Sequence, residues 1–133
     1  MTEIIFLWLD EVIEIHFDQI KRYGGLPGIR DIELLKSAIA MPAAGFGEEY
    51  FCTDIFEMAA AYLFHIVQNH PFIDGNKRTG AVASVVFLLM NGIELKADDD
   101  RFEKLVLSVA NSKIEKTTIA EFFRKNSIKL NEL

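Results

Sequence analysis

The sequence predicts an all-α fold, a bundle of about six helices in one domain that spans residues 1–133. The chain is 50% hydrophobic and 26% charged, which is typical of a globular protein and not of a disordered one. Glycine, proline and asparagine residues divide it into pieces of helical length, within which apolar residues recur at helical spacing. No convincing strand alternation, internal repeat or linker appears, so one helical domain is expected.

The first helix is expected over residues 7–23, where apolar residues follow helical spacing until Gly24-Gly25 ends the pattern. A glycine- and proline-containing loop follows over residues 24–28. Asp31 can then cap a short helix that ends near residue 40, before a proline. Residues 41–52 contain two further glycines, and we expect a mobile surface loop there.

Two helices with apolar residues on nearly every side are expected in the middle of the chain. Asp54 and Glu57 form a start signature for the first, over residues 55–67. The second covers residues 76–90 and is stopped by Asn91-Gly92. Helices that are apolar all round belong in the interior of a domain, so these two should form its centre.

Two amphipathic helices are expected after residue 97. Residues 98–100 are three aspartates that cap a helix start, and the stripe that follows has helical spacing (Phe102, Leu105, Val106 and Val109). Thr118 and Glu121 have the spacing of a capping box for a last helix.

The two isolated histidines, His16 and His65, lie within expected helices, and packed structural roles are predicted for both. Cys52 is the single cysteine, so no internal disulfide can form, and we do not expect it to act as a nucleophile. The net charge of −6 argues against a protein that binds nucleic acid or anionic membranes through a general excess of positive charge. The longest apolar run, residues 81–90, is too short to span a bilayer. Residues 4–9 are also apolar, but they follow Glu3 and no small-residue cleavage site comes after them, so we do not expect a secretory signal there. A cytoplasmic protein is expected.

A polar segment, NHPFIDGNKRTG at residues 69–80, separates the two apolar helices. Lys77 and Arg78 fall in the first turn of the second helix, where the helix dipole disfavours each cation by roughly 0.3–1 kcal/mol. A bound phosphate would reverse that sign, since the backbone N–H groups, both cations and the Asn76 amide would all be favourable partners. The segment therefore indicates an anion site.

The neighbouring residues add chemistry to this anion site. Histidine is the side chain best suited to accept a proton near neutral pH, which makes His70 a candidate base. Asp74 is the kind of oxygen ligand that Mg²⁺ accepts, and Gly75 lets the backbone turn sharply or approach a ligand. In the alternative interpretation Asp74 only caps the helix and the two cations extend into solvent. Phe72 is expected to anchor the segment in the core.

Three stretches in order along the chain resemble the Fic/Doc family, in particular its death-on-curing (Doc) branch. They are RYGGLPG at residues 22–28, HPFIDGNKR at 70–78 and VVFLLMNG at 85–92. The likeness covers nearly the whole chain, and the motif of mixed chemistry between two apolar helices is highly specific. The resemblance implies a Fic/Doc-type helical bundle in which two central apolar helices flank the motif loop.

The resemblance also implies roles for single residues. His70 would be the general base toward a hydroxyl of a target protein, and Asp74 would hold Mg²⁺ that bridges nucleotide phosphates. Asn76 and Arg78 would bind those phosphates. Lys77 departs from nucleotidyl-transferring members, which usually have glycine there and a further arginine where this chain has Ala81. In Doc-like members this pattern accompanies transfer of the terminal phosphoryl group of ATP to a threonine of elongation factor Tu.

A toxin of a toxin–antitoxin pair is thus implied, restrained by a separate antitoxin whose disordered tail folds on binding. Some family members instead carry an inhibitory helix with Ser or Thr, then Glu four residues later, then Gly or Asn. Thr117 and Glu121 have the first spacing, but Phe122 occupies the third position and the capping box explains the pair better. Two alternatives stay open: a Fic-type nucleotidyltransferase that adds AMP to a protein hydroxyl, and a non-catalytic binding protein with the same fold.

Overall fold

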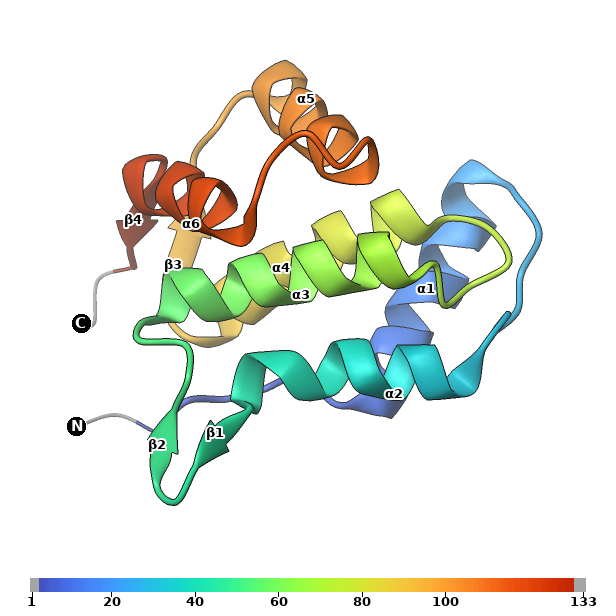
Figure 1. Cartoon of the computed structure of the whole chain (residues 1–133). Coiled ribbons are helices and arrows are strands. Elements are labelled where there is room, and N and C mark those ends of the chain that lie inside the picture. Colours follow the sequence, from blue (N-terminus) through green and yellow to red (C-terminus); the bar gives the residue numbers. More distant parts are fainter. Residues whose placement is uncertain (1–2, 131–133) are drawn as a thin grey trace.

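The computed structural model describes residues 3–130, and these form six α-helices and four short strands (Figure 1). The helices are α1 (Leu9–Tyr23), α2 (Ile32–Ala40), α3 (Ile55–Asn69), α4 (Asn76–Met90), α5 (Asp99–Ala110) and α6 (Lys116–Lys125). A 3₁₀ helix, η1 (Met41–Ala43), follows α2. The expected all-α fold is confirmed, and the observed bounds of α1 to α4 lie within about two residues of those predicted.

The antiparallel pair α3 and α4 forms the centre, with the other helices around it (Figure 1). Eight of the fifteen residues of α3 are buried, because its sequence is apolar on nearly every side. Gly80 of α4 lets the two helices approach closely, since a Cβ there would lie 3.0 Å from Cγ2 of Val67. The close pairing fixes the loop between the two helices at one end of the bundle.

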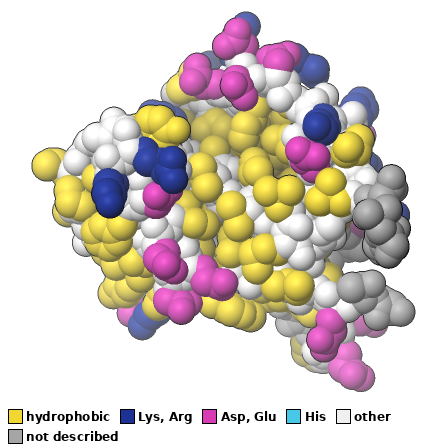
Figure 2. Space-filling view, turned by 180° about the vertical axis from the view of Figure 1, so that it is seen from behind, with side chains coloured by type: hydrophobic (Ala, Val, Ile, Leu, Met, Phe, Trp, Pro, Cys, Tyr) yellow, Lys and Arg dark blue, Asp and Glu magenta, His cyan; other side chains and the backbone are white. Residues whose placement is uncertain are grey.

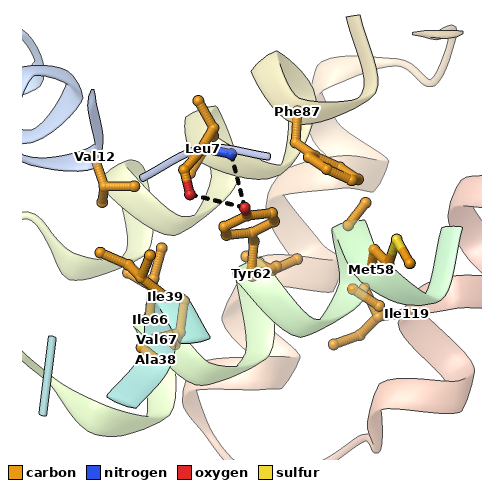
Figure 3. Packing of buried hydrophobic residues seen from close by; sticks show 14 of the residues in the cluster. Leu7, Val12, Ala38, Ile39, Met58, Tyr62, Ile66, Val67, Phe87 and Ile119 are labelled. Carbon is orange, nitrogen blue, oxygen red and sulfur yellow. Dashed lines mark hydrogen bonds between the residues drawn. The ribbon is translucent and has the colours of Figure 1, made fainter. Parts of the chain in front are cut away.

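A buried tyrosine fastens the N-terminal segment to this central pair. The Tyr62 hydroxyl donates to the carbonyl oxygen of Leu7 at 2.9 Å and accepts from the Leu7 N–H at 2.8 Å (Figure 3). Its ring lies 5.0 Å from that of Phe87 in α4. Both polar groups of a buried extended segment are therefore satisfied without a strand partner.

Three helices begin at an aspartate, as the sequence predicts. The carboxylates of Asp31, Asp54 and Asp98 each accept a backbone N–H three residues further on, at 3.0, 2.9 and 2.8 Å. The predicted capping box at residues 118–121 is wrong. The last helix starts earlier, at Lys116 after Glu115, so the N–H of Thr118 already bonds within the first turn.

The expectation of no strand is also wrong for four very short segments. β1 (Gly45–Phe46) pairs with β2 (Glu49–Tyr50), and β3 (Ile93–Leu95) pairs with β4 (Ser127–Lys129), both antiparallel. Residues 41–52, expected as a loop, therefore hold η1 and a hairpin. Strands of two or three residues are too short to show an alternating pattern. Within residues 3–130, no helix has the length and apolar character needed to cross a membrane.

Candidate active site at the start of α4

The loop between α3 and α4 opens into a cavity of about 380 Å³ at one end of the central pair. Every residue that the sequence singled out for the site lines it, together with one exposed isoleucine: His70, Ile73, Asp74, Gly75, Asn76, Lys77 and Arg78. The structure thus brings the predicted base, metal ligand and anion-binding residues to one opening. His70 is exposed and not enclosed in the core.

His70 ends α3 in a left-handed backbone conformation, with φ 48° and ψ 53°. For a residue other than glycine this costs on the order of 1–2 kcal/mol, so neighbouring contacts must hold it. Arg30 provides them, because its Nε donates to the His70 carbonyl oxygen at 2.6 Å and its Nη2 to that of Asn69 at 3.0 Å. Arg30 could not be predicted as a site residue, since nothing near it in the sequence distinguishes it from an ordinary surface arginine.

The glycine-rich loop after α1 pairs with the motif loop. The N–H of Ile73 donates to the carbonyl oxygen of Gly28 at 3.0 Å, and the N–H groups of Arg30 and Asp31 both donate to that of Pro71, at 2.7 and 3.0 Å. These hydrogen bonds therefore join two segments far apart in sequence along one side of the site. The likeness at residues 22–28 and 70–78 corresponds to this contact.

Asp74 is an exposed carboxylate that backbone N–H groups hold in place. Its Oδ1 accepts from Gly75 at 2.8 Å and its Oδ2 from Leu26 at 3.2 Å. These bonds lower the pKa of Asp74, with the charge of Arg78 adding to the effect, so the group is ionised at neutral pH. No group of three or more metal-ligating side chains exists among residues 3–130. A site of this kind fits Mg²⁺ that takes its other ligands from water and phosphate oxygens.

The backbone at the start of α4 is shaped by Gly75 and Asn76. Gly75 is the N-cap residue, with φ 74°, and no side chain caps the helix, so the interpretation that Asp74 caps α4 is wrong. The Asn76 side chain is buried and bonds both the N–H and the carbonyl oxygen of Phe72, at 2.9 and 3.0 Å. Asn76 thus shapes the loop through its side chain and leaves its backbone N–H at the uncapped helix start.

The two cations of this first turn differ in their contacts. Arg78 donates from Nη2 to the carbonyl oxygen of Gly24 at 2.9 Å and lies 5.8 Å from the centre of the Tyr23 ring, so it also holds the end of α1. The Lys77 side chain is exposed and makes no hydrogen bond or ion pair with any residue in the described part of the chain. Lys77 is therefore the cation that is free to meet an incoming anion.

Comparison with known proteins places the chain in a family. The sequence profile of the Fic/DOC family matches residues 6–88, which include both paired loops. The chain belongs to the Fic/Doc family. It is 34% identical over 116 residues to "Protein kinase doc" of Escherichia phage P1, covering 87% of this chain and 90% of that protein. It is 39% identical over 101 residues to "Toxin Doc" of Mycolicibacterium smegmatis, covering 74% and 77%.

Proposed function

We propose that this Fic/Doc protein is the toxin of a toxin–antitoxin pair that transfers the terminal phosphoryl group of ATP to a protein hydroxyl. The hydroxyl we expect is a threonine of a translation factor such as elongation factor Tu. The observation that carries the proposal is the uncapped, cationic start of α4, which opens into the same cavity as His70 and Asp74. The name of the phage relative, a protein kinase, supports the choice of reaction.

The residues divide the chemistry between them. The exposed imidazole of His70 accepts the proton of the target hydroxyl as its oxygen forms a bond to the γ-phosphorus. The bond between that phosphorus and the β,γ-bridging oxygen breaks, and ADP leaves. The N–H groups at the start of α4, with Lys77 and Arg78, stabilise charge on the phosphates. Asp74 would hold Mg²⁺, which neutralises phosphate charge when bound.

Lys77 is the feature that favours phosphoryl over nucleotidyl transfer. Nucleotidyl-transferring relatives typically have a glycine and a second arginine at two positions of this motif. This chain has Lys77 and Ala81 at those positions. A lysine is a flexible point charge, so it changes where the triphosphate is held and which phosphorus lies beside the hydroxyl. Incubation with a translation factor and ATP labelled at either the α or the γ position separates the two reactions. Label from the γ position is expected on the protein, and label from the α position alone would refute phosphoryl transfer.

The antitoxin would bind the face formed by α1, α4 and α5. Two adjoining cavities, of about 600 and 470 Å³, lie along it and share Val82. Figure 2 shows a band of hydrophobic side chains across this face with Asp and Glu side chains at its borders. The lining carboxylates are Glu11, Glu14, Asp18, Asp99 and Glu103. An apolar floor with an acidic rim suits an amphipathic helix with basic flanks, such as a tail that folds on binding.

Position explains how such a tail would inhibit. Lys77 and Arg78 line both the larger of these cavities and the candidate active site, so an occupant would lie beside the phosphate-binding cations. Leu107 is 43% exposed and lines the larger of these two cavities but not the active site. Replacing it by Asp therefore tests the proposed antitoxin surface at a position outside the core. Leu107→Asp is expected to stay toxic when the antitoxin is co-expressed, whereas the wild-type protein is neutralised. Neutralisation of both would rule out this surface.

A further inference from the structure

His16 of α1 lies beneath the candidate active site and is completely buried, with 0% of its surface exposed. Its ring stacks on that of Phe72 in the motif loop, with centroids 3.9 Å apart and planes 7° from parallel. This is the closest ring stacking among the aromatic pairs of the described residues. A polar ring is thus packed directly against the motif loop.

Both ring nitrogens of His16 are used. Nε2 accepts the N–H of Gly28 at 3.3 Å, and Nδ1 lies 3.4 Å from Oγ1 of Thr79. An acceptor Nε2 carries no hydrogen, so the neutral ring has its hydrogen on Nδ1 and donates it to Thr79. Burial lowers the pKa of His16, and the charge of Arg78 adds to this while that of Asp74 opposes it.

The partners of His16 belong to three different segments of the site. Gly28 lies in the glycine-rich loop, and its carbonyl oxygen accepts from the Ile73 N–H. Phe72 is the residue whose N–H and carbonyl oxygen are held by the Asn76 side chain. Thr79 is in the first turn of α4. One buried ring therefore sets the spacing between the glycine-rich loop, the motif loop and the helix that carries the cations.

We propose that His16 is a positioning residue, which holds these three segments in register so that His70 and Asp74 face the same cavity. This inference rests on the function proposed above for the reaction, although the positioning itself can be measured without it. Misplacement of a reacting group by about 1 Å can cost on the order of 100-fold in rate. The N–H groups and cations of α4 bind phosphate from the helix itself, so loss of His16 should lower kcat far more than it raises KM for ATP.

Two substitutions separate this role from simple packing. His16→Phe keeps a flat ring to stack on Phe72 but removes both hydrogen bonds, which leaves the Gly28 N–H unpaired. His16→Gln places an amide oxygen near the position of Nε2 and can restore that acceptor. His16→Phe is expected to lower kcat by about 10- to 100-fold with KM for ATP within about threefold. His16→Gln is expected to recover most of the loss.

His65 offers a matched control, because it is a second histidine in a helix and its Nε2 lies 2.9 Å from the Nζ of Lys116 in α6. Desolvation, with the charge of Lys116, lowers the pKa of His65 to about 4. His65→Phe should change thermal stability and leave kcat of the folded protein within about twofold. Folded His16→Phe with wild-type kcat, His16→Gln no better than His16→Phe, or an equal loss in His65→Phe would each overturn the inference.

Amide hydrogen exchange measures the positioning independently of any activity. In His16→Phe the N–H groups of Gly28 and Ile73 should exchange at least about tenfold faster, while those of α6 stay unchanged. Unchanged exchange at both residues would overturn the inference even if the enzyme is active. A wild-type protein that transfers no phosphoryl group, yet shows the local acceleration in the variant, would refute the proposed reaction and leave the positioning role supported.

Discussion

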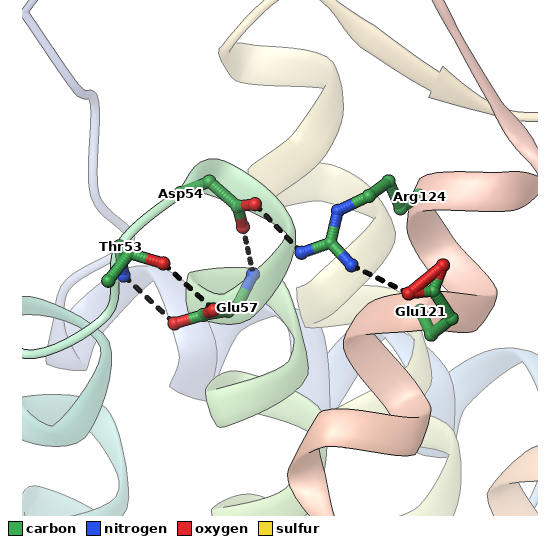
Figure 4. Close-up of polar contacts among 5 residues, drawn as sticks. All are labelled: Thr53, Asp54, Glu57, Glu121 and Arg124. Carbon is green, nitrogen blue, oxygen red and sulfur yellow. Dashed lines mark hydrogen bonds and ion pairs between the residues drawn. The ribbon is translucent and has the colours of Figure 1, made fainter.

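The two central helices are of equal length, fifteen residues each, but their first turns have opposite chemistry. At the start of α3 the Asp54 carboxylate accepts the Glu57 N–H at 2.9 Å and pairs with Arg124 of α6 at 2.7 Å (Figure 4). The Glu57 carboxylate in turn accepts from the N–H and hydroxyl of Thr53, at 2.9 and 2.8 Å. The chain itself thus supplies the negative charge that this helix end favours.

The start of α4 lacks all of these features. Its N-cap is Gly75 without a side-chain bond, its first turn has no acidic residue, and Lys77 and Arg78 add positive charge to the positive end of the helix. By helix geometry, the first turns of α3 and α4 each have N–H groups without a partner within the helix. The difference teaches that α3 is completed within the fold, whereas α4 is left complementary to an anion from outside.

The largest expected effect concerns His70, the proposed base beside this uncapped end. His70→Asn removes the imidazole while keeping a residue that tolerates the left-handed conformation. Loss of a general base costs about 10²- to 10⁴-fold, so phosphoryl transfer and growth inhibition should both fall accordingly. His65→Asn in the same helix is the matched control and should stay toxic at equal expression. Equal inhibition of growth by His70→Asn and the wild type would show that the protein acts by binding alone.

Lys77→Glu gives the start of α4 an acidic first turn like that of α3. The carboxylate should repel phosphate and lower kcat/KM for ATP by about 100-fold. At the same time, replacing an unfavourable cation by a favourable anion should stabilise the fold by about 1 kcal/mol. Lys36→Glu, on the exposed face of α2, changes the net charge equally; it loses only a solvent-exposed ion pair with Glu33 at 3.7 Å, and should neither weaken ATP binding nor stabilise the fold. Calorimetric binding of ATP and thermal unfolding measure the two effects, and ATP binding unchanged by Lys77→Glu would contradict the anion site.

The contrast between the two helix starts could largely be predicted from the sequence, because caps and first-turn charges are local. Asp54 and Glu57 on one side and Lys77 and Arg78 on the other lie within a few residues of the helix ends they affect. The motif residues are contiguous, so their convergence on one cavity required only a turn between two helices. The short strands could not be predicted, because their pairing depends on contacts between distant segments.

The supporting contacts of the site were equally out of reach for the sequence. Arg30 holds the His70 turn and His16 lies under Phe72, yet both come from α1 or the loop after it. The sequence predicts a packed, structural role for His16, and its burial confirms that it is packed. Its partners follow only from the fold, since Gly28 and Thr79 lie on separate segments. The expected phosphate contact of the Asn76 amide likewise competes with its two bonds to Phe72, which only coordinates reveal.

Disruption of the capped end should affect stability and not activity. Asp54→Ala removes the cap of α3 and its pairing with Arg124, and should lower the free energy of unfolding by about 1–2 kcal/mol. Arg124→Met removes only the partly exposed ion pair and should cost at most about 1 kcal/mol. Urea denaturation measures both. Because His70 lies at the other end of α3, kcat of folded Asp54→Ala should equal that of the wild type, and a large loss would show that this end also serves catalysis.

A further test of the comparison uses a ligand that binds only one of the two helix ends. Inorganic tripolyphosphate has the three linked phosphates of ATP without its nucleoside. By mass action it should raise the free energy of unfolding of the wild type by ~1.4 kcal/mol at ten times its Kd. Asp54→Ala should show the same increment from its lower Tm, because its altered helix end is not the one that binds. Lys77→Glu should show almost none, although it starts from a higher Tm. An equal increase in stability in all three proteins would mean that the anion binds elsewhere. A carboxylate in the first turn of α4 repels phosphate, so an anion bound there could not stabilise Lys77→Glu as much as the wild type.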